Sequence, residues 1–195
     1  MESSDFLFIG NQFTADFVNT RKTIKGERTE LLTSWEELTR WLEQAGKAHV
    51  VTGSGDALPE EERADLLRRI IAFRGKLEQA FAAIEDERTL PAPFVASLND
   101  ELSGYRSYCQ LDATESGVAA VRHYDVSQLP ALFLEEAALF FASFKPDNLK
   151  KCENETCILH FYDTSRNQQR RWCSMDRCGN RMKANQHYHR RKSGS

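Results

Sequence analysis

Four cysteines near the carboxyl end constrain the fold of this 195-residue chain more than any other feature. They follow the spacing Cys152-x4-Cys157-x15-Cys173-x4-Cys178. Zinc favours four thiolates in a tetrahedron, and two close pairs of cysteines supply two sulfurs each. The pattern therefore predicts one zinc ion bound by these four side chains. Since four sulfurs leave no open position for water, we expect a structural ion rather than a catalytic one.

Other side chains near this pattern offer alternatives. His160, His187 and His189 are competing ligands, but four cysteines already fill the tetrahedron. A set of four unrelated buried thiols would not explain why the cysteines come in pairs. The fifth cysteine, Cys109, stands alone in an apolar-looking segment, so we expect it to be a small buried hydrophobic residue without chemistry.

The segments around the cysteines predict a hairpin followed by a helix. Residues 160–163 and 170–172 are the expected strands, and Ser174 is the expected N-cap of a helix that continues to about residue 191. Gly179 lacks a Cβ, which we expect to let the backbone approach the neighbouring cysteine sulfur. The expected module is a small treble-clef-like unit spanning 146–192.

Charge is distributed unevenly along the chain. Residues 1–144 carry 14 Lys/Arg and 24 Asp/Glu, a balance of −10, whereas residues 145–195 carry 12 and 5, a balance of +7. Four thiolates and one zinc ion would leave the second segment at about +5. A solvated basic tail would have the same charge, but here the charge lies beside a metal-ligand pattern. This favours two parts with different partners, the basic one facing a polyanion.

Residues 1–145 predict a mainly helical domain with one β-hairpin. The Ser34-Trp35-Glu36-Glu37 capping box and the apolar spacing after it predict a helix that ends near Gly46. A charged loop is expected at 21–33. The remaining expected elements are a short helix within 6–20, helices at about 59–84, 92–104 and 129–144, and a hairpin of 105–111 with 117–124. Residues 193–195 are assigned to a tail.

Two stretches of the sequence resemble known families. The stretch RRWCSM at 170–175, followed by CGNR at 178–181, resembles the CGNR zinc finger, and DTSRN at 163–167 between the cysteine pairs fits the same family. Near the amino end, ADFVNT at 15–20 is similar to the ABATE domain, which usually precedes this finger. The resemblance covers nearly the whole chain. It implies a stress-response transcription regulator whose finger binds DNA.

The basic residues of the zinc segment are the expected DNA contacts. Lysine and arginine neutralise phosphates, whereas asparagine and arginine read base edges. Arg181 has an alternative role, which is to brace the zinc site or an acidic patch. The full set of expected DNA-binding residues is Arg166, Arg170, Arg171, Arg177, Asn180, Arg181, Lys183, Arg190, Arg191 and Lys192.

The sequence is also compatible with functions other than DNA binding. A zinc-stabilised adaptor for proteins and an RNA-binding protein are the main alternatives. No nucleophile–base pair or carboxylate dyad stands out, so we expect no enzyme. Asp16, Asn19 and Thr20 are the expected ligand-binding residues if the first domain senses a small-molecule effector, and the alternative is a satisfied polar helix end.

The sequence also predicts where the protein is located and whether it contacts a membrane or a second copy. The chain shows no transmembrane run and no secretory signal at its start, so we expect a cytoplasmic protein without a membrane partner. A homodimer is attractive because one finger alone buries little DNA surface.

Overall fold

The computed structural model describes residues 5–115 and 117–185, and contacts between residues group the chain into two compact units. One unit is made of Leu32–Ala80 and Leu90–Ser143. The other combines three pieces, Met1–Leu31, Phe81–Thr89 and Phe144–Ser195. The zinc segment therefore shares a unit with the amino-terminal residues. The predicted division into domains at residue 145 stays a prediction.

Helices dominate the unit formed by Leu32–Ala80 and Leu90–Ser143. They are α2 (Trp35–Gln44), α4 (Ala92–Ser103), α5 (Pro130–Ser143) and the part of α3 (Glu60–Glu87) that precedes Phe81. The Ser34 hydroxyl accepts a hydrogen bond from the Glu37 amide at 3.3 Å, as expected for the cap of α2. Trp41 is fully buried and stacks on Phe133, with ring centroids 5.8 Å apart.

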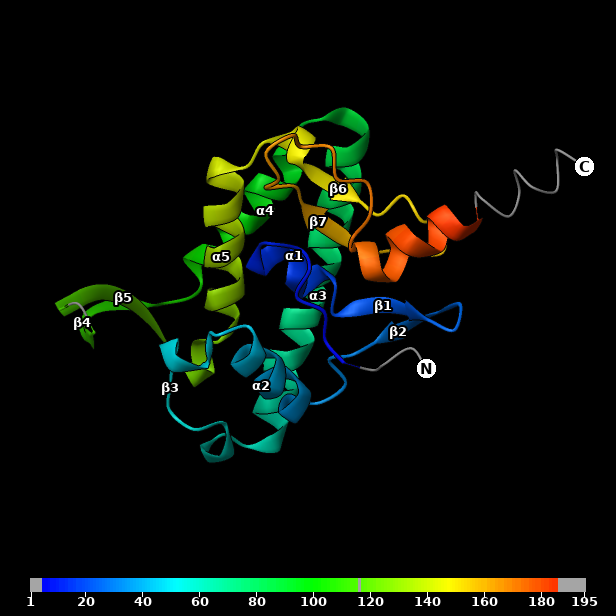
Figure 1. The fold of residues 1–195 in the computed structure, drawn as a ribbon. Coiled ribbons are helices and arrows are strands. Elements are labelled where there is room, and N and C mark those ends of the chain that lie inside the picture. Colours follow the sequence, from blue (N-terminus) through cyan, green and yellow to red (C-terminus); the bar gives the residue numbers. More distant parts are fainter. Residues whose placement is uncertain (1–4, 116, 186–195) are drawn as a thin grey trace, which may run out of the picture. The chain divides into compact units, whose positions relative to one another are not determined.

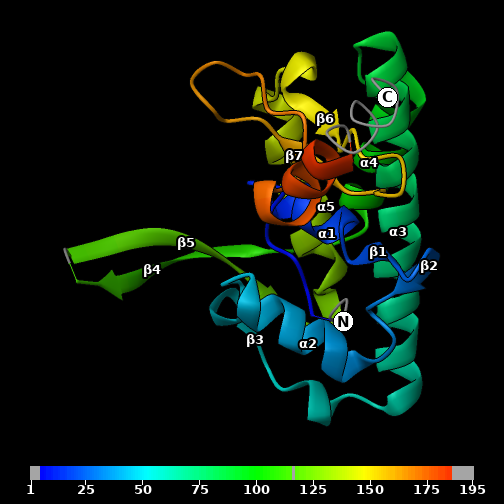
Figure 2. The ribbon, with the colours of Figure 1, turned by 45° about the vertical axis from the view of Figure 1, so that its right-hand side comes forward.

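A β-hairpin in the same unit confirms the predicted pair of strands. Strand β4 (Tyr108–Thr114) runs antiparallel to β5 (Gly117–Asp125), and the short β3 (Val51–Thr52) runs parallel to the end of β5. Figures 1 and 2 show β4 and β5 extending away from α2 and α5. The prediction that Cys109 is buried is wrong, because it lies on a hairpin face that its unit leaves exposed.

The amino-terminal piece of the other unit contains a helix and a second hairpin. Helix α1 (Phe13–Val18) is followed by the antiparallel strands β1 (Arg21–Ile24) and β2 (Glu27–Glu30). The prediction of a charged loop over 21–33 is therefore wrong. Lys25 and Gly26 both have positive φ, 52° and 88°, which suits a two-residue turn whose twist matches that of the strands.

The zinc segment contains the predicted hairpin and helix, but with a different strand partner. Strand β6 (Leu149–Lys151) pairs antiparallel with β7 (His160–Tyr162), and residues 170–172 form no strand. After it, Met175–Gly179 forms a π-helical turn that continues as α-helix over 180–185. The helix expected beyond 185 and the tail at 193–195 lie outside the described residues.

The fully buried carboxylate of Asp163 explains why the second predicted strand is absent. It accepts hydrogen bonds from the backbone amides of Ser165, at 3.0 Å, and Arg170, at 2.8 Å. Amides that donate to this side chain are not available for a β-ladder. The spacing of the cysteine pairs did not reveal this competition.

Amino-terminal residues bond to the backbone of β7. The side-chain amide of Asn19 donates to the carbonyl of His160 at 2.8 Å and accepts from its amide at 2.9 Å. The amide of Tyr162 donates to the carbonyl of Gly10 at 2.8 Å. The first residues of the chain therefore satisfy backbone groups of a strand some 140 residues later.

The predicted fold class, mainly helical with a small hairpin-plus-helix zinc module, is confirmed. Among the helices that the structure describes, none is both long enough and apolar enough to cross a membrane.

Replacing Asn19 with alanine tests the link between the amino-terminal residues and β7. Asn19 is 1% exposed, so the change leaves the His160 amide and carbonyl buried without partners. We expect Asn19→Ala to lower the free energy of unfolding by about 3 kcal/mol, measured by urea denaturation of the zinc-loaded chain. The exposed Asn99 on α4 gives the control Asn99→Ala. Equal stabilities of the two variants would contradict the link.

Candidate metal centre and its surroundings

The first cysteine pair lies at either end of a tight turn after β6. The amide of Cys152 donates to Leu159, at 2.9 Å, and the amide of Cys157 donates to Asn154, at 2.8 Å. The Asn154 side chain caps the turn by accepting from the amide and hydroxyl of Thr156. These bonds hold the two sulfurs on the same side of the turn.

The second pair lies at the start of the carboxyl-terminal helical segment. The Ser174 hydroxyl accepts from the Arg177 amide at 3.2 Å, as predicted for a cap, and the Cys178 amide donates to the Ser174 carbonyl at 3.1 Å. A Cβ on Gly179 would lie 2.6 Å from the Met175 sulfur and 3.2 Å from the Trp172 ring. A larger residue at this position would therefore require these side chains to move, and the expected approach to the cysteine sulfur stays a prediction.

The four sulfurs form a cluster with the dimensions of a zinc site. All lie within 4.8 Å of one another, with 3.8 Å between the sulfurs of Cys157 and Cys173 and 3.6 Å between those of Cys173 and Cys178. A zinc tetrahedron with bonds of about 2.3 Å has edges of about 3.8 Å. The residues present therefore fit one zinc ion. Cys109 and His160 are not in the cluster.

Electrostatics within the cluster call for a cation. Hydrogen bonds from the Cys157 and Cys173 thiols lower the pKa of Cys152 to about 2. The hydrogen bond between Cys157 and Cys152 raises the pKa of Cys157 to about 12. The hydrogen bond between Cys173 and Cys152 likewise raises the pKa of Cys173. One thiolate thus opposes ionisation of its neighbours. A bound zinc ion supplies the positive charge that lets all four ionise.

A donor outside the four ligands also faces the cluster. The side-chain amide of Asn154 lies 3.3 Å from the sulfur of Cys178, and Asn154 is 4% exposed. Such a hydrogen bond stabilises a thiolate and orients it. Sequence reasoning missed Asn154, although an asparagine two residues before a threonine is a signal for this kind of turn.

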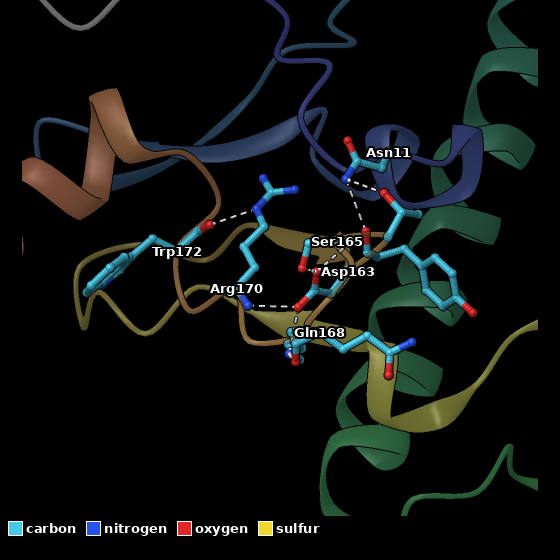
Figure 3. A network of polar contacts seen from close by, with 9 residues as sticks. Asn11, Asp163, Ser165, Gln168, Arg170 and Trp172 are labelled. Carbon is cyan, nitrogen blue, oxygen red and sulfur yellow. Dashed lines mark hydrogen bonds and ion pairs between the residues drawn. The ribbon is translucent and has the colours of Figure 1, made fainter.

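Asp163 organises the loop between the two cysteine pairs (Figure 3). Besides the two amides, its carboxylate accepts from the Ser165 hydroxyl at 2.6 Å and from the Lys150 ammonium at 2.8 Å. Burial alone would raise the pKa of Asp163, but these hydrogen bonds outweigh it and hold the pKa well below the usual range. The carboxylate is therefore a fixed structural anion, a role that sequence reasoning did not assign.

Arg170, a predicted DNA contact, is engaged within the protein. Its guanidinium donates to the carbonyl of Trp172 at 3.0 Å (Figure 3). It also donates to the carbonyl of Ile9, at 3.0 Å, and to that of Cys173. The same group lies 4.2 Å from the centroid of the Phe161 ring. These contacts favour a bracing role beside the metal site, and a DNA contact by Arg170 stays a prediction.

The other predicted cationic residues differ in their surroundings. Arg171 is exposed, but it forms an ion pair with Glu153 at 2.5 Å. Lys183 is exposed and lies 5.9 Å from the centroid of the Trp172 ring. The remaining described members of the set are exposed: Arg166, Arg177, Asn180 and Arg181. Arg190, Arg191 and Lys192, like His187 and His189, lie outside the described residues.

A hollow beside the zinc site brings two segments together. It has a volume of about 430 Å³ and is lined by Lys22 and Lys25 of the first hairpin and by Arg177 and Arg181 of the zinc segment. Three of the four cysteines also line it. Lys25 therefore lies near the predicted DNA-binding residues. Sequence reasoning missed it because 150 residues separate the two segments and the hairpin was predicted as a loop.

The predicted ligand-binding residues are buried and have partners inside the protein. Asp16 accepts from the Gly10 amide at 2.7 Å, and the Thr20 hydroxyl donates to the Phe17 carbonyl at 2.6 Å. Asn19 holds β7, as described above. These contacts match the alternative of a satisfied polar helix end, and a ligand at these residues stays a prediction.

Two family models match the sequence. The model described as CGNR zinc finger covers residues 148–191, which include all four clustered cysteines. The ABATE model, described as "Putative stress-induced transcription regulator", covers residues 12–143, more than half of the chain. A search of the curated proteins finds no match. The matches confirm both resemblances, and with the sulfur cluster they support one structural zinc ion.

Metal analysis of cysteine variants tests the zinc site. We expect one zinc per chain in the wild type and in Cys109→Ser, whose altered side chain is exposed and outside the cluster. We expect Cys173→Ser to lose the ion, because three thiolates bind zinc more weakly than four. Atomic emission measurements on dialysed protein give the ratio. Loss of zinc in Cys109→Ser with retention in Cys173→Ser would contradict the assignment.

The raised pKa of Asp16 predicts that the free energy of unfolding depends on pH. Burial raises the pKa of Asp16 from 3.8 to about 6, although hydrogen bonds from the Gly10 and Ile9 amides lower it in part. Because the folded state binds this proton more tightly, the stabilising contribution is full below pH 4 and is lost as the pH rises through 6. Asp16→Asn keeps an acceptor for Gly10 but does not titrate.

The stability of the wild type relative to Asp16→Asn should therefore fall by about 2 kcal/mol between pH 4 and pH 7. Chemical denaturation at a series of pH values measures this difference. The comparison isolates Asp16 because the cysteines titrate in both proteins. Asp100→Asn, at an exposed site on α4, is the control. A difference that does not change with pH would contradict the shifted pKa.

Proposed function

We propose that this chain, which belongs to the ABATE family and carries a CGNR zinc finger at its carboxyl end, is a zinc-dependent DNA-binding transcription regulator. The observation that carries the proposal is the position of Arg177, Arg181 and Lys183. All three are exposed and flank or follow the metal ligand Cys178. The zinc site therefore fixes the start of a cationic surface.

The charge of this surface suits a phosphate backbone. Residues 145–195 carry a balance of +7 before the metal site is counted. Exposed lysines and arginines neutralise phosphates and release counterions, which gives affinity without sequence information. We assign phosphate contacts to Arg166, Arg177, Arg181 and Lys183, and from the sequence alone we add Arg190, Arg191 and Lys192.

Sequence reading requires side chains with paired donors and acceptors. Asn180 is exposed at the start of the 180–185 helix, and the side-chain amide of asparagine matches the edge of adenine in the major groove. We assign base contact to Asn180 and assign Arg170 and Arg171 to the frame of the module, because their guanidinium groups bind within the protein.

We propose a binding protein of the cytoplasm that responds to stress, not an enzyme, with the ABATE domain as the part that receives a small-molecule effector or a protein partner. The alternatives of RNA binding and of a protein adaptor are separate outcomes of the experiment below.

Salt-dependent binding to random duplex DNA tests the proposal. We expect the triple variant Arg177→Gln, Arg181→Gln and Lys183→Gln to bind more weakly at low salt. The slope of log affinity against log salt should become shallower by about 2 to 3, because each lost phosphate contact removes about 0.9. Fluorescence anisotropy of a labelled duplex gives both quantities.

A matched variant controls for net charge. Arg68→Gln, Arg69→Gln and Arg106→Gln removes three exposed cations outside the zinc segment, and it should keep the wild-type slope. Equal slopes for both triple variants would contradict the assigned surface. Stronger binding to single-stranded RNA than to duplex DNA would support the RNA-binding alternative, and no binding of either at low salt would favour the adaptor.

A further inference from the structure

The hairpin of β4 and β5 has one apolar face that is exposed. Leu111 is 72% exposed and Val118 is 70% exposed, although both are large aliphatic side chains. Because Leu111 pairs with Ala120 and Ala113 pairs with Val118, these four side chains share one face. Cys109 and Arg122 complete this face, and all six residues are exposed. An exposed apolar cluster of this kind is typical of an interaction surface.

The backbone of β4 is also available for pairing. The strand order β3-β5-β4 places β4 at the edge of its sheet. Thr114 and Gly117 close the hairpin across a two-residue loop, so they form a hydrogen-bonded pair. Hydrogen-bonded pairs alternate along an antiparallel ladder, so the even-numbered residues of β4 bond to β5. The odd-numbered residues direct their amides and carbonyls away from β5. Strand β4 contains neither proline nor lysine, and its register has no bulge. It thus lacks three of the usual features that block edge-to-edge association, and its charged residue, Asp112, is hydrogen-bonded to Gln110 and His123 of its own chain.

We propose that β4 pairs antiparallel with β4 of a second copy of this chain, about a two-fold axis at Leu111. Leu111 is the middle residue of the seven-residue strand, so this register pairs the whole strand with its copy. Leu111 then lies opposite Leu111 of the second copy, and Cys109 lies opposite Ala113. The two apolar faces join into one, and the outward amides and carbonyls of both strands become paired.

The other face of the strand is complementary in the same register. Gln110 lies opposite Asp112 of the second copy, so an amide donor meets a carboxylate acceptor. Within its own chain Asp112 lies 2.8 Å from His123, and hydrogen bonds from Gln110 and His123 lower the pKa of Asp112. No like charges lie directly opposite each other across the pair, and the two Asp112 carboxylates are diagonal neighbours that each have a Gln110 amide opposite them. This self-complementarity selects a second copy as the occupant over an unrelated strand.

The other edge of the hairpin, formed by β5, is less suitable for pairing with a second copy. A two-fold axis on β5 at Ala120 would place Val118 against Arg122, an apolar side chain against a charge. The end of that edge is also paired with β3, through Val51–Tyr124 and Thr52–Asp125. Strand β4 therefore offers the longer and more complementary edge.

The small size of the paired strands limits the expected affinity of the dimer. A seven-residue strand pair lies below the standard interface of about 1,600 Å², so we expect a dimer with a dissociation constant in the micromolar range. The proposal does not depend on DNA binding, and its test uses the zinc-loaded full chain without nucleic acid.

Sedimentation velocity over about 1 to 200 μM measures the association. We expect a monomer–dimer equilibrium for the wild type and a dissociation constant at least about 100-fold higher for Leu111→Lys, because two leucines are lost from the interface and two lysines face each other. Leu139→Lys on α5, at a leucine that is 67% exposed, is the matched control and should behave as the wild type. Circular dichroism checks that each variant keeps its fold.

Disulfide trapping tests the register in a Cys109→Ser background. Opposed Cα atoms in a hydrogen-bonded pair lie about 5.5 Å apart, within reach of a disulfide, so Leu111→Cys should form a covalent dimer under mild oxidation. Thr114→Cys, on the same exposed strand, should not, because its copy lies about 20 Å away in this register. A wild type that stays monomeric at 200 μM, a dimer unaffected by Leu111→Lys, or equal trapping at both positions would overturn the proposal.

Discussion

Four cysteine sulfurs within 4.8 Å of one another oppose each other's ionisation, and a bound divalent cation relieves that opposition. The arrangement of the zinc segment depends on this cluster. The first pair closes the turn after β6, and the second pair begins the segment that carries the exposed cations. A segment with such short strands has little apolar core of its own, so the metal substitutes for one.

The metal cluster is joined to the amino-terminal residues by apolar packing and by hydrogen bonds. Leu7 and Ile9 pack against the core that contains Cys152, Cys173 and Cys178. Asn19 bonds to the backbone of β7, and Arg170 bonds to the carbonyl of Ile9. Asn19 and Arg170, which were predicted to bind a ligand and DNA, thus also stabilise the unit. Buried hydrogen bonds of this kind specify one arrangement because leaving either partner unpaired is costly.

Short-range signals made much of this structure predictable from sequence. The cysteine spacing predicts the metal site, and the Ser34 and Ser174 caps predict where helical segments begin. Two β-like stretches around a turn-rich segment predict the hairpin of β4 and β5. The features that sequence analysis missed depend on distant partners. The fully buried Asp163 draws amides away from the predicted strand, and Asn19 has its partner some 140 residues away. Cys109 is exposed because no other element of its unit packs on that face of the hairpin, and the local sequence does not reveal this.

The most direct test of a metal-dependent DNA-binding surface is reversible removal of zinc. Binding of a labelled random duplex would be measured for the zinc-loaded chain, again after a strong chelator, and again after zinc is restored. If the metal holds the exposed cations in place, affinity should fall on chelation and return with zinc. Affinity that is unchanged by zinc removal, or no binding by the zinc-loaded chain even at low salt, would contradict this account.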